Sequence, residues 1–326
     1  MNILVVGLGS MGKRRIRLLR ENLKIHTITG VDTKEERINY VRDEYNIKAY
    51  SNISEALSKN DYTAAFVCTA PLSHINIIDI CLDHRINVFS EINLVSDGYN
   101  DIIKKANDYN CKLFLSSTPM YRKEIQYTTQ KVKESMQRLN YIYHVGQYLP
   151  DWHPWESYND FFVGDKRTNG CRELFAIELP WIIDAFGDIE SIHSIKDKIS
   201  NLEIDYCDNY IVVVTHKSGH KGVLCFDIVS RKATRTLEVL GENTHIKWGG
   251  TPESLFEYNI KDAIDVKVDT YDSVNRNSNY SGNIIENMYV DEILAFMSYL
   301  QHDTVPLYSF EKDLYTLSII DEIERI

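Results

Sequence analysis

Gly7-Leu8-Gly9-Ser10-Met11-Gly12 is the stretch of sequence that decides the fold. It follows an apolar, β-branched run at residues 2–7 and precedes a segment with the pattern of an amphipathic helix. Asp32 lies 20 residues beyond the last glycine, at the end of a second apolar run. A G-x-G-x-x-G motif between a strand and a helix, with an acidic residue at this distance, is typical of a dinucleotide-binding fold.

Each position of the motif has a physical task. Gly7 makes the tight turn, Gly9 lets the backbone approach a pyrophosphate, and Gly12 permits close packing of helix and strand. Ser10 and Met11 begin the helix, whose free N–H groups and partial positive charge favour an anion. The motif therefore predicts a diphosphate-binding loop.

Asp32 bears on the choice of cofactor. Its carboxylate is expected to accept hydrogen bonds from the adenosine ribose and to repel a 2′-phosphate, which favours NAD over NADP. Thr33 and Lys34 weaken this preference slightly, because a lysine can pair with the extra phosphate. The alternative interpretation is a glycine turn with an aspartate that caps a helix.

The rest of the first third alternates between strand-like and helix-like segments. This alternation predicts βαβ units and a doubly wound parallel sheet, an α/β Rossmann domain. The expected strands are 26–31, 63–69, 86–90 and 111–117, and the expected helices are 34–45, 73–84 and 97–109.

The pattern changes near residue 120. Helix-like stretches at 122–137, 171–186, 284–301 and 309–325 accompany β segments that follow one another with little helix between them. Strands in succession predict an α+β domain with an open, mostly antiparallel sheet. The expected strands are 139–149, 191–197, 208–216, 221–229, 234–240, 244–248 and 264–269. We therefore predict two domains, 1–120 and 121–326.

Composition excludes several classes of function. The 326 residues carry a formal net charge of −11, which argues against binding to nucleic acid or an anionic membrane through bulk charge. No apolar run reaches the length of a membrane span, and no basic, cleavable leader opens the sequence. The six cysteines form no C-x-x-C pair, so we expect free thiols, no metal site and a cytoplasmic location.

An ordered series of segments resembles one family. VVGLGSMG at 5–12, GVD at 30–32, CTAPLSH at 68–74 and INVFSEINL at 86–94 are similar to segments of the Gfo/Idh/MocA oxidoreductases. The resemblance implies an NAD-dependent enzyme that acts on a sugar or a sugar derivative. It also implies a homodimer or homotetramer formed through the sheet of the second domain.

The resemblance also implies roles for residues at the ends of two strands. Thr69, Pro71 and His74 match a segment that lines the cofactor in this family, although His74 can equally be a residue that only caps or flanks a helix. Glu91 matches the glutamate of the family's Glu-Lys-Pro motif, and Asn93 is expected to contact the cofactor beside it.

Two positions depart from the family pattern. Ile92 stands where the family has a lysine, and Ile177 stands where it has a histidine, whereas Glu173 keeps the family's carboxylate. Either other residues move the proton, or hydride transfer has been lost. The alternatives are a non-catalytic NAD-binding regulatory or scaffold protein, and an epimerase or lyase that recycles NAD in place.

The stretch 143–158 is the first place to look for a replacement group. His153 is our first candidate for proton transfer and Glu173 the second. Alternatively, the stretch is a hydrophobic cover in which His153 is structural. Arg122 suits an anionic group on the substrate. The full set of expected substrate-binding residues is Tyr121, Arg122, Tyr148, Asp151, Trp152, Trp155 and Glu178. The resemblance to this family, in which a similar Trp-His-Pro-Trp loop occurs, implies a sugar or nucleotide-sugar dehydrogenase in surface polysaccharide or nonulosonic acid precursor synthesis.

Overall fold

The computed structural model describes residues 1–277 and 284–325, which form two compact units. The first unit comprises Met1–Ser117 and Tyr289–Leu314. The second comprises Thr118–Met288 and Tyr315–Ile326. The division into domains 1–120 and 121–326 stays a prediction, and the contacts additionally group Tyr289–Leu314, near the C-terminus, with the first unit.

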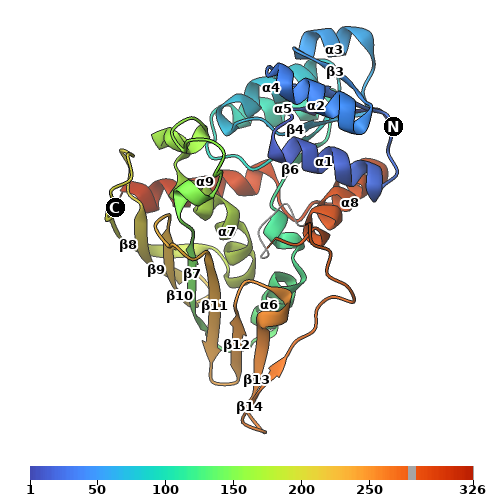
Figure 1. The fold of residues 1–326 in the computed structure, drawn as a ribbon. Coiled ribbons are helices and arrows are strands. Elements are labelled where there is room, and N and C mark those ends of the chain that lie inside the picture. Colours follow the sequence, from blue (N-terminus) through green and yellow to red (C-terminus); the bar gives the residue numbers. More distant parts are fainter. Residues whose placement is uncertain (278–283, 326) are drawn as a thin grey trace. The chain divides into compact units, whose positions relative to one another are not determined.

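A six-stranded parallel sheet forms the centre of the first unit (Figure 1). Its order is β3-β2-β1-β4-β5-β6, and all neighbouring strands are parallel. The order reverses between β1 and β4, the position at which open α/β sheets bind ligands beyond the carboxyl ends of their strands. The strands are β1 (Ile3–Val6), β2 (Ile28–Val31), β3 (Lys48–Tyr50), β4 (Ala64–Val67), β5 (Asn87–Ser90) and β6 (Leu113–Leu115).

Helices connect the parallel strands, and β1, β2 and β4 are buried along their whole length. Complete burial of parallel strands is expected where both faces of a sheet are covered. The predicted doubly wound sheet is confirmed. The helices and helical turns of this unit are α1 (Ser10–Glu21), α2 (Glu35–Tyr45), α3 (Ile53–Lys59), η1 (Pro71–Ser73), α4 (His74–Asp83), α5 (Tyr99–Tyr109), most of α8 (Asn287–His302) and the start of α9 (Phe310–Arg325).

Four aromatic rings explain why α8 belongs to the first unit. Phe66, Phe89 and Phe114 are register partners on β4, β5 and β6, and their neighbouring rings stack at 4.7 and 5.0 Å. Phe296 of α8 lies 5.5 Å from each of these three rings. All four side chains are fully buried, so α8 completes the core of a sheet from which it is far removed in sequence.

An eight-stranded sheet forms the centre of the second unit, in the order β14-β13-β12-β11-β7-β10-β9-β8. Only β7 and β10 pair in parallel, and the other neighbours are antiparallel. This confirms the expected open, mostly antiparallel sheet. The strands are β7 (Asn140–Gly146), β8 (Ile189–Asp197), β9 (Asn209–His216), β10 (Lys221–Asp227), β11 (Thr234–Gly241), β12 (Thr244–Trp248), β13 (Leu255–Asn259) and β14 (Ile264–Lys267).

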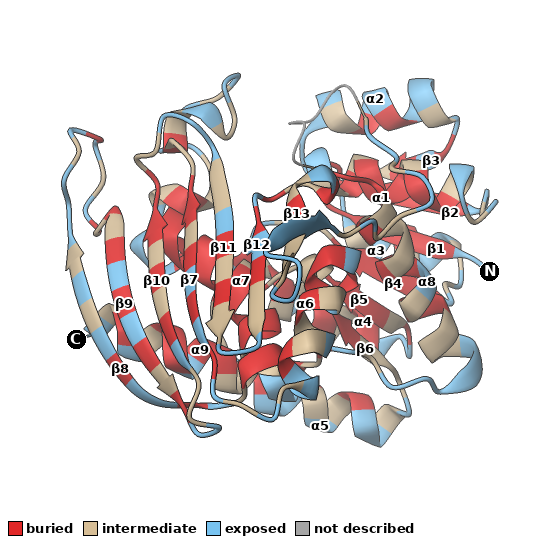
Figure 2. Cartoon of the chain, turned by 90° about the horizontal axis from the view of Figure 1, so that it is seen from below, coloured by how far each residue is buried: buried red, intermediate tan, exposed pale blue. Residues whose placement is uncertain are grey.

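The two faces of this sheet differ in burial (Figure 2). Along β7 and β9 buried residues alternate with more exposed ones, as expected for a sheet with one covered face. Tyr141 and Tyr143 on the covered face contact Phe186 and Trp181 of α7. The remaining helices and turns of this unit are η2 (Thr118–Tyr121), α6 (Lys123–Glu134), η3 (Leu149–Asp151), η4 (Phe162–Gly164), η5 (Lys166–Thr168), α7 (Gly170–Phe186), η6 (Pro252–Ser254) and the rest of α9.

Three short elements were not predicted from the sequence. They are β3, α3 and β13, and each has seven residues or fewer. A segment of this length carries too few periods for its hydrophobic pattern to identify it. Across residues 1–277 and 284–325, no helix combines the length and apolar character that crossing a membrane requires.

Candidate active site

The glycine loop joins β1 to α1 in the first unit. Gly7 has φ +92°, and a Cβ there would lie 2.6 Å from the carbonyl oxygen of Cys68. A Cβ on Gly12 would lie 1.9 Å from the carbonyl oxygen of Gly7. At Gly9, by contrast, the nearest atom to a Cβ is the end of the Arg37 side chain, at 3.6 Å. The fold itself therefore requires the outer two glycines, whereas the middle one leaves room for a ligand.

Ser10 and Met11 form the first turn of α1, and no side chain caps this helix from Gly9. Its first N–H groups are therefore available to an anion, as at other helix N-termini that hold phosphate. The cradle left by the glycines and these free donors fit the diphosphate of a dinucleotide.

Asp32 follows β2 and is 8% exposed. Its Oδ2 accepts a hydrogen bond from the backbone N–H of Leu8 at 2.7 Å, and its Oδ1 accepts one from the N–H of Lys34 at 2.9 Å. The Arg37 Nη1 lies 3.4 Å from Oδ2. Arg37 was not among the residues predicted from the sequence, where the signal for it is a basic residue five positions after Asp32. Arg37 offers a cation beside the carboxylate expected to select the cofactor.

We expect Asp32→Asn to shift cofactor preference from NADH toward NADPH by about tenfold or more. The change keeps the size of the side chain but removes the charge that repels a 2′-phosphate, and it leaves Arg37 without its anionic partner. Hydrogen bonds to a charged group contribute about 1.5–3 kcal/mol, which corresponds to such a factor. Fluorescence titrations with NADH and NADPH measure the ratio, with Asp43→Asn on the exposed face of α2 as the control. An unchanged ratio would contradict the ribose contact.

His74, Thr69 and Asn93 come together at the ends of β4 and β5. The His74 ring is 1% exposed, with Nε2 at 2.8 Å from the Thr69 carbonyl oxygen and Nδ1 at 2.6 Å from Oδ1 of Asn93. Burial lowers the pKa of His74, so the ring is neutral near pH 7. Pro71 begins the turn η1 between Thr69 and His74. The structure thus groups four of the predicted cofactor residues beyond the carboxyl ends of parallel strands.

Glu91 takes part in a buried ion cluster that the sequence did not indicate. Arg15 of α1 donates hydrogen bonds to Glu91 at 2.6 and 3.2 Å and to Glu292 of α8 at 2.7 Å. The Oε1 of Glu292 also accepts hydrogen bonds from the Ser116 hydroxyl and the Ser117 N–H, both at 2.9 Å. One arginine thus fixes two carboxylates, and Glu91 is held in place immediately before Ile92 and Asn93.

Glu173 lies in the first turn of α7, in the second unit. Asn169 caps this helix by accepting a hydrogen bond from the Arg172 N–H at 2.8 Å. The Oε2 of Glu173 is buried and has no hydrogen-bond partner in the part of the chain that the structure describes. Burial raises the pKa of Glu173 to about 8. A carboxyl group in this state can take up or release a proton near neutral pH. Ile177 follows one turn later.

His153 has a different environment. Its Nδ1 lies 2.9 Å from Oε1 of Glu156, and its ring stacks on Trp155 at 5.1 Å and lies 4.5 Å from Phe161. All of these contacts are between residues of one loop, the loop between η3 and η4. The side chain of His153 remains 30% exposed.

Other expected substrate residues lie in or near the same loop. Trp155 is 71% exposed. Trp152 donates a hydrogen bond to the Gln147 carbonyl at 3.3 Å, and Arg231 lies 4.1 Å from the Tyr148 ring centre. Asp151 is exposed. The loop therefore offers aromatic surface and an acidic group, as the sequence suggested.

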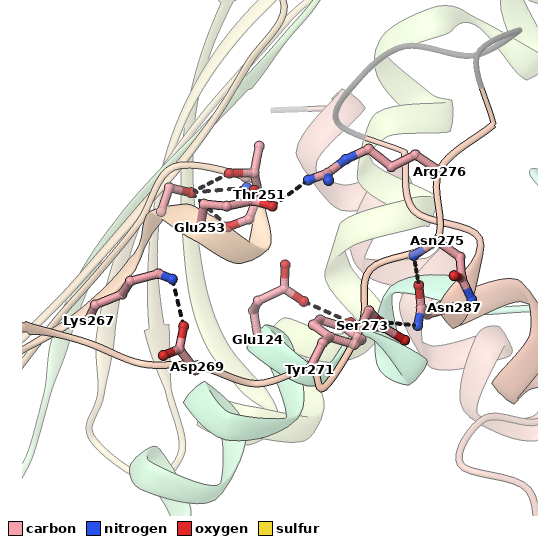
Figure 3. Close-up of polar contacts among 12 residues, drawn as sticks. Glu124, Thr251, Glu253, Lys267, Asp269, Tyr271, Ser273, Asn275, Arg276 and Asn287 are labelled. Carbon is pink, nitrogen blue, oxygen red and sulfur yellow. Dashed lines mark hydrogen bonds and ion pairs between the residues drawn. The ribbon is translucent and has the colours of Figure 1, made fainter.

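Arg122 is buried and already paired. Its Nη2 lies 2.9 Å from Glu124 and donates to the Gly250 carbonyl at 2.8 Å, while its guanidinium lies 4.9 Å from the Trp248 ring centre. Glu124 also accepts a hydrogen bond from the Tyr271 hydroxyl at 2.9 Å, so the segment after β14 is attached to α6 (Figure 3). These contacts stabilise the second unit, and a contact between Arg122 and a substrate anion stays a prediction.

Glu178 and Tyr121 are also buried. Glu178 accepts hydrogen bonds from the Tyr143 hydroxyl at 2.6 Å, the Trp181 indole at 2.8 Å and Arg235 at 2.6 Å. A carboxylate with this many partners ties α7 to the sheet. Substrate binding by Glu178 and Tyr121 likewise stays a prediction.

Comparison with known proteins agrees with the geometry of the glycine loop. Residues 1–116 match the Gfo/Idh/MocA model, described as an oxidoreductase family with an NAD-binding Rossmann fold. Residues 1–116 belong to this family. The chain is thus an NAD-binding oxidoreductase, and the predictions of family, fold class and cofactor are confirmed.

Solved structures extend the likeness in fold to nearly the whole chain. The WlbA dehydrogenase from Bordetella pertussis, solved with NADH and UDP-GlcNAcA, is 14% identical, with a TM-score of 0.80 over 99% of this chain and 95% of that chain. The UDP-N-acetylglucosamine 3-dehydrogenase GnnA from Acidithiobacillus ferrooxidans is 14% identical, with a TM-score of 0.76 over 99% and 96%.

An oxidoreductase from Agrobacterium radiobacter, solved with NAD+, L-tartaric acid and magnesium, is 11% identical, with a TM-score of 0.80 over 98% and 94%. At these identities the likeness shows the fold. No curated protein matches the sequence.

Proposed function

We propose that this oxidoreductase interconverts a hydroxyl and a carbonyl group on a sugar or nucleotide sugar, in surface polysaccharide or nonulosonic acid precursor synthesis. Two proteins of similar fold are named for such chemistry, a UDP-N-acetylglucosamine 3-dehydrogenase and a dehydrogenase solved with UDP-GlcNAcA. The exposed ring of Trp155 suits the apolar C–H face of a sugar, and Asp151 suits its hydroxyl groups.

The environment of the Glu173 carboxyl group is the observation that carries the proposal. A dehydrogenase needs a group that takes the hydroxyl proton, and this chain has isoleucine at both positions where the family places a lysine and a histidine. Glu173 is a partly buried residue whose Oε2 is buried and unpartnered among the described residues, and its pKa is raised to about 8, so it can serve as that group. His153 is the second candidate, although its Nδ1 is engaged with Glu156.

The residues of the first unit hold the cofactor in this proposal. NAD supplies a nicotinamide ring that accepts or donates the hydride. The glycine loop and the N-terminus of α1 bind the diphosphate, and Asp32 binds the adenosine ribose. His74 stays neutral and fixes Thr69 and Asn93, while Arg15 fixes Glu91. The chain's contribution is thus to bind and orient the cofactor and to move one proton.

A panel of UDP-sugars, including UDP-N-acetylglucosamine and its uronic acid, tests the proposal with NAD+ and detection of NADH absorbance. We expect NADH to accumulate with at least one sugar that has a free ring hydroxyl. The replacement of the family lysine and histidine favours a second candidate, an epimerase or lyase that recycles NAD. A changed sugar without net NADH would show that activity. Binding of NADH with no change in any sugar would overturn both.

The more exposed face of the eight-stranded sheet is the proposed contact surface for a second copy of the chain. Ile142, Ile195, Ile211 and Val213 lie on β7, β8 and β9 and are between 43% and 73% exposed. Strand residues of this type normally lie in a core, so their exposure favours a partner on this face.

We expect the wild-type protein to be a dimer or tetramer, and Ile211→Lys to shift it to the monomer. A lysine at the centre of an apolar contact has to lose its hydration shell, which opposes association. Light scattering after gel filtration measures the mass, with Ile260→Lys, at an exposed isoleucine between β13 and β14, as the control. A monomeric wild type would contradict this assembly.

A cytoplasmic location is also part of the proposal. All six cysteines are free in the structure, as expected for a reducing compartment.

A further inference from the structure

His144, Cys225 and Asp227 form a group of side chains outside the candidate active site. β7 and β10 are parallel neighbours, and His144 is the register partner of Cys225. Asp227 lies two residues further along β10, so its side chain points to the same face of the sheet as that of Cys225. One ligand atom from each residue lies within 4.8 Å of those of the other two, and the His144 Nε2 is 2.8 Å from the Asp227 Oδ2.

The Asp227 carboxylate is held in place by its own loop. Its Oδ1 accepts hydrogen bonds from the N–H groups of Val229 at 3.0 Å and Ser230 at 2.7 Å, and its Oδ2 accepts one from the Ser230 hydroxyl at 3.0 Å. Gly146 makes room for this arrangement, because a Cβ there would lie 2.5 Å from Oδ2 of Asp227. Such outer hydrogen bonds orient the ligands of a metal site before the ion arrives.

Two apolar side chains flank the group on the same face of the sheet. Ile142 lies two residues before His144, and Ile211 is the register partner of Cys225. These two side chains are 48% and 43% exposed. Beside these two side chains, an imidazole, a thiol and a carboxylate offer three ligand atoms to a cation, and the apolar neighbours limit access of water from their side.

We propose that His144, Cys225 and Asp227 bind one divalent transition-metal ion, with zinc as the best match. Nitrogen, sulfur and oxygen ligands from these three residue types are those that zinc takes in proteins. Water fills the fourth position of a tetrahedral site. Thiolate and imidazole ligands disfavour magnesium and calcium, which prefer oxygen. The site lies on the sheet and is independent of the proposed dehydrogenase activity.

Cobalt is the probe for this site, because Co²⁺ bound by a thiolate has an intense charge-transfer absorption. The full-length protein is first freed of metal with a chelator and then titrated with Co²⁺. We expect one equivalent to produce the band and one equivalent of Zn²⁺ to abolish it. Cys225→Ser is expected to remove the band, whereas Cys111→Ser, at another partly exposed free cysteine, keeps it.

His144→Gln and Asp227→Asn are expected to weaken Co²⁺ binding by about tenfold or more. NADH titration and thermal unfolding show whether each variant is folded. If Asp227→Asn does not fold, Cys225→Ser and His144→Gln decide the question. Equal Co²⁺ affinity and spectrum in the wild type and Cys225→Ser would overturn the proposal and leave an ordinary His–Asp ion pair. Absence of Co²⁺ binding in the wild type would overturn it as well.

Discussion

Glu173→Gln is expected to reduce turnover by about a hundredfold or more while NADH binding stays unchanged. Glutamine has nearly the same shape as glutamate, but it cannot take a proton from the hydroxyl group of the substrate. Proton transfer by a positioned side chain typically contributes about 10²–10⁴-fold. Initial rates with the active UDP-sugar and a fluorescence titration with NADH measure the two quantities separately.

Matched variants make this result specific. Glu190→Gln removes an exposed carboxylate of β8 and is expected to retain full activity. His153→Ala tests the competing candidate. If His153→Ala loses activity to the same extent and Glu173→Gln does not, then the histidine moves the proton and Glu173 is merely buried.

The pH dependence of the wild type has a defined sign. Only the ionised form of Glu173 accepts a proton, and its pKa is raised to about 8. For oxidation of the sugar, kcat/KM is therefore expected to fall about tenfold for each pH unit below about 8 and to level off above it. If Glu173 governs this pH dependence of kcat/KM, the residual activity of Glu173→Gln does not show it. A profile that is flat between about pH 6 and 9 would contradict this role.

The same shift of the pKa makes stability depend on pH. Between the ordinary value of 4.5 and about 8 the folded state binds more protons at Glu173 than the unfolded state does. The free energy of unfolding therefore falls as pH rises through this range. Glu173→Gln removes this contribution, so we expect the variant to gain stability relative to the wild type from about pH 6 to about pH 8.5 in urea unfolding.

The sequence predicted those parts of the fold that depend on local patterns. The glycine loop and Asp32 have fixed spacings, and the alternation of strands with helices indicates a parallel sheet directly. The assignment of α8 to the first unit was not predictable in this way. It depends on Phe296 meeting three rings whose positions follow from strand pairing, a relation between distant residues that has no period or spacing.

The candidate site shows the same limit. Glu173 was identified by its place in a family pattern, but its burial and its unpartnered oxygen depend on neighbours from elsewhere in the chain. Arg122 suited a substrate anion by residue type alone. In the structure its charge is met by Glu124 and by a carbonyl more than a hundred residues away, at Gly250. Residue type indicates what a side chain can do, whereas only tertiary contacts decide whether it is free to do so.

Two glycine variants of the loop separate folding from cofactor binding. A Cβ on Gly12 would lie 1.9 Å from the carbonyl oxygen of Gly7, and a backbone oxygen cannot move away without displacing the strand. We expect Gly12→Ala to lower the free energy of unfolding by about 1–3 kcal/mol or more and to abolish detectable NADH binding.

Gly9→Ala is expected to leave the fold intact and still weaken NADH binding by about tenfold or more. Gly9 has φ −71° and ψ −158°, a conformation open to any residue, and the nearest atom to its Cβ is the flexible end of Arg37. The cost to stability is at most about 1 kcal/mol, because alanine is a poorer N-cap than glycine. The new methyl group nevertheless occupies the space through which the backbone approaches the diphosphate. Thermal unfolding and NADH titration of both variants test this. If Gly9→Ala binds NADH like the wild type, the diphosphate does not lie against this glycine, because the loop would then tolerate a side chain at its point of contact.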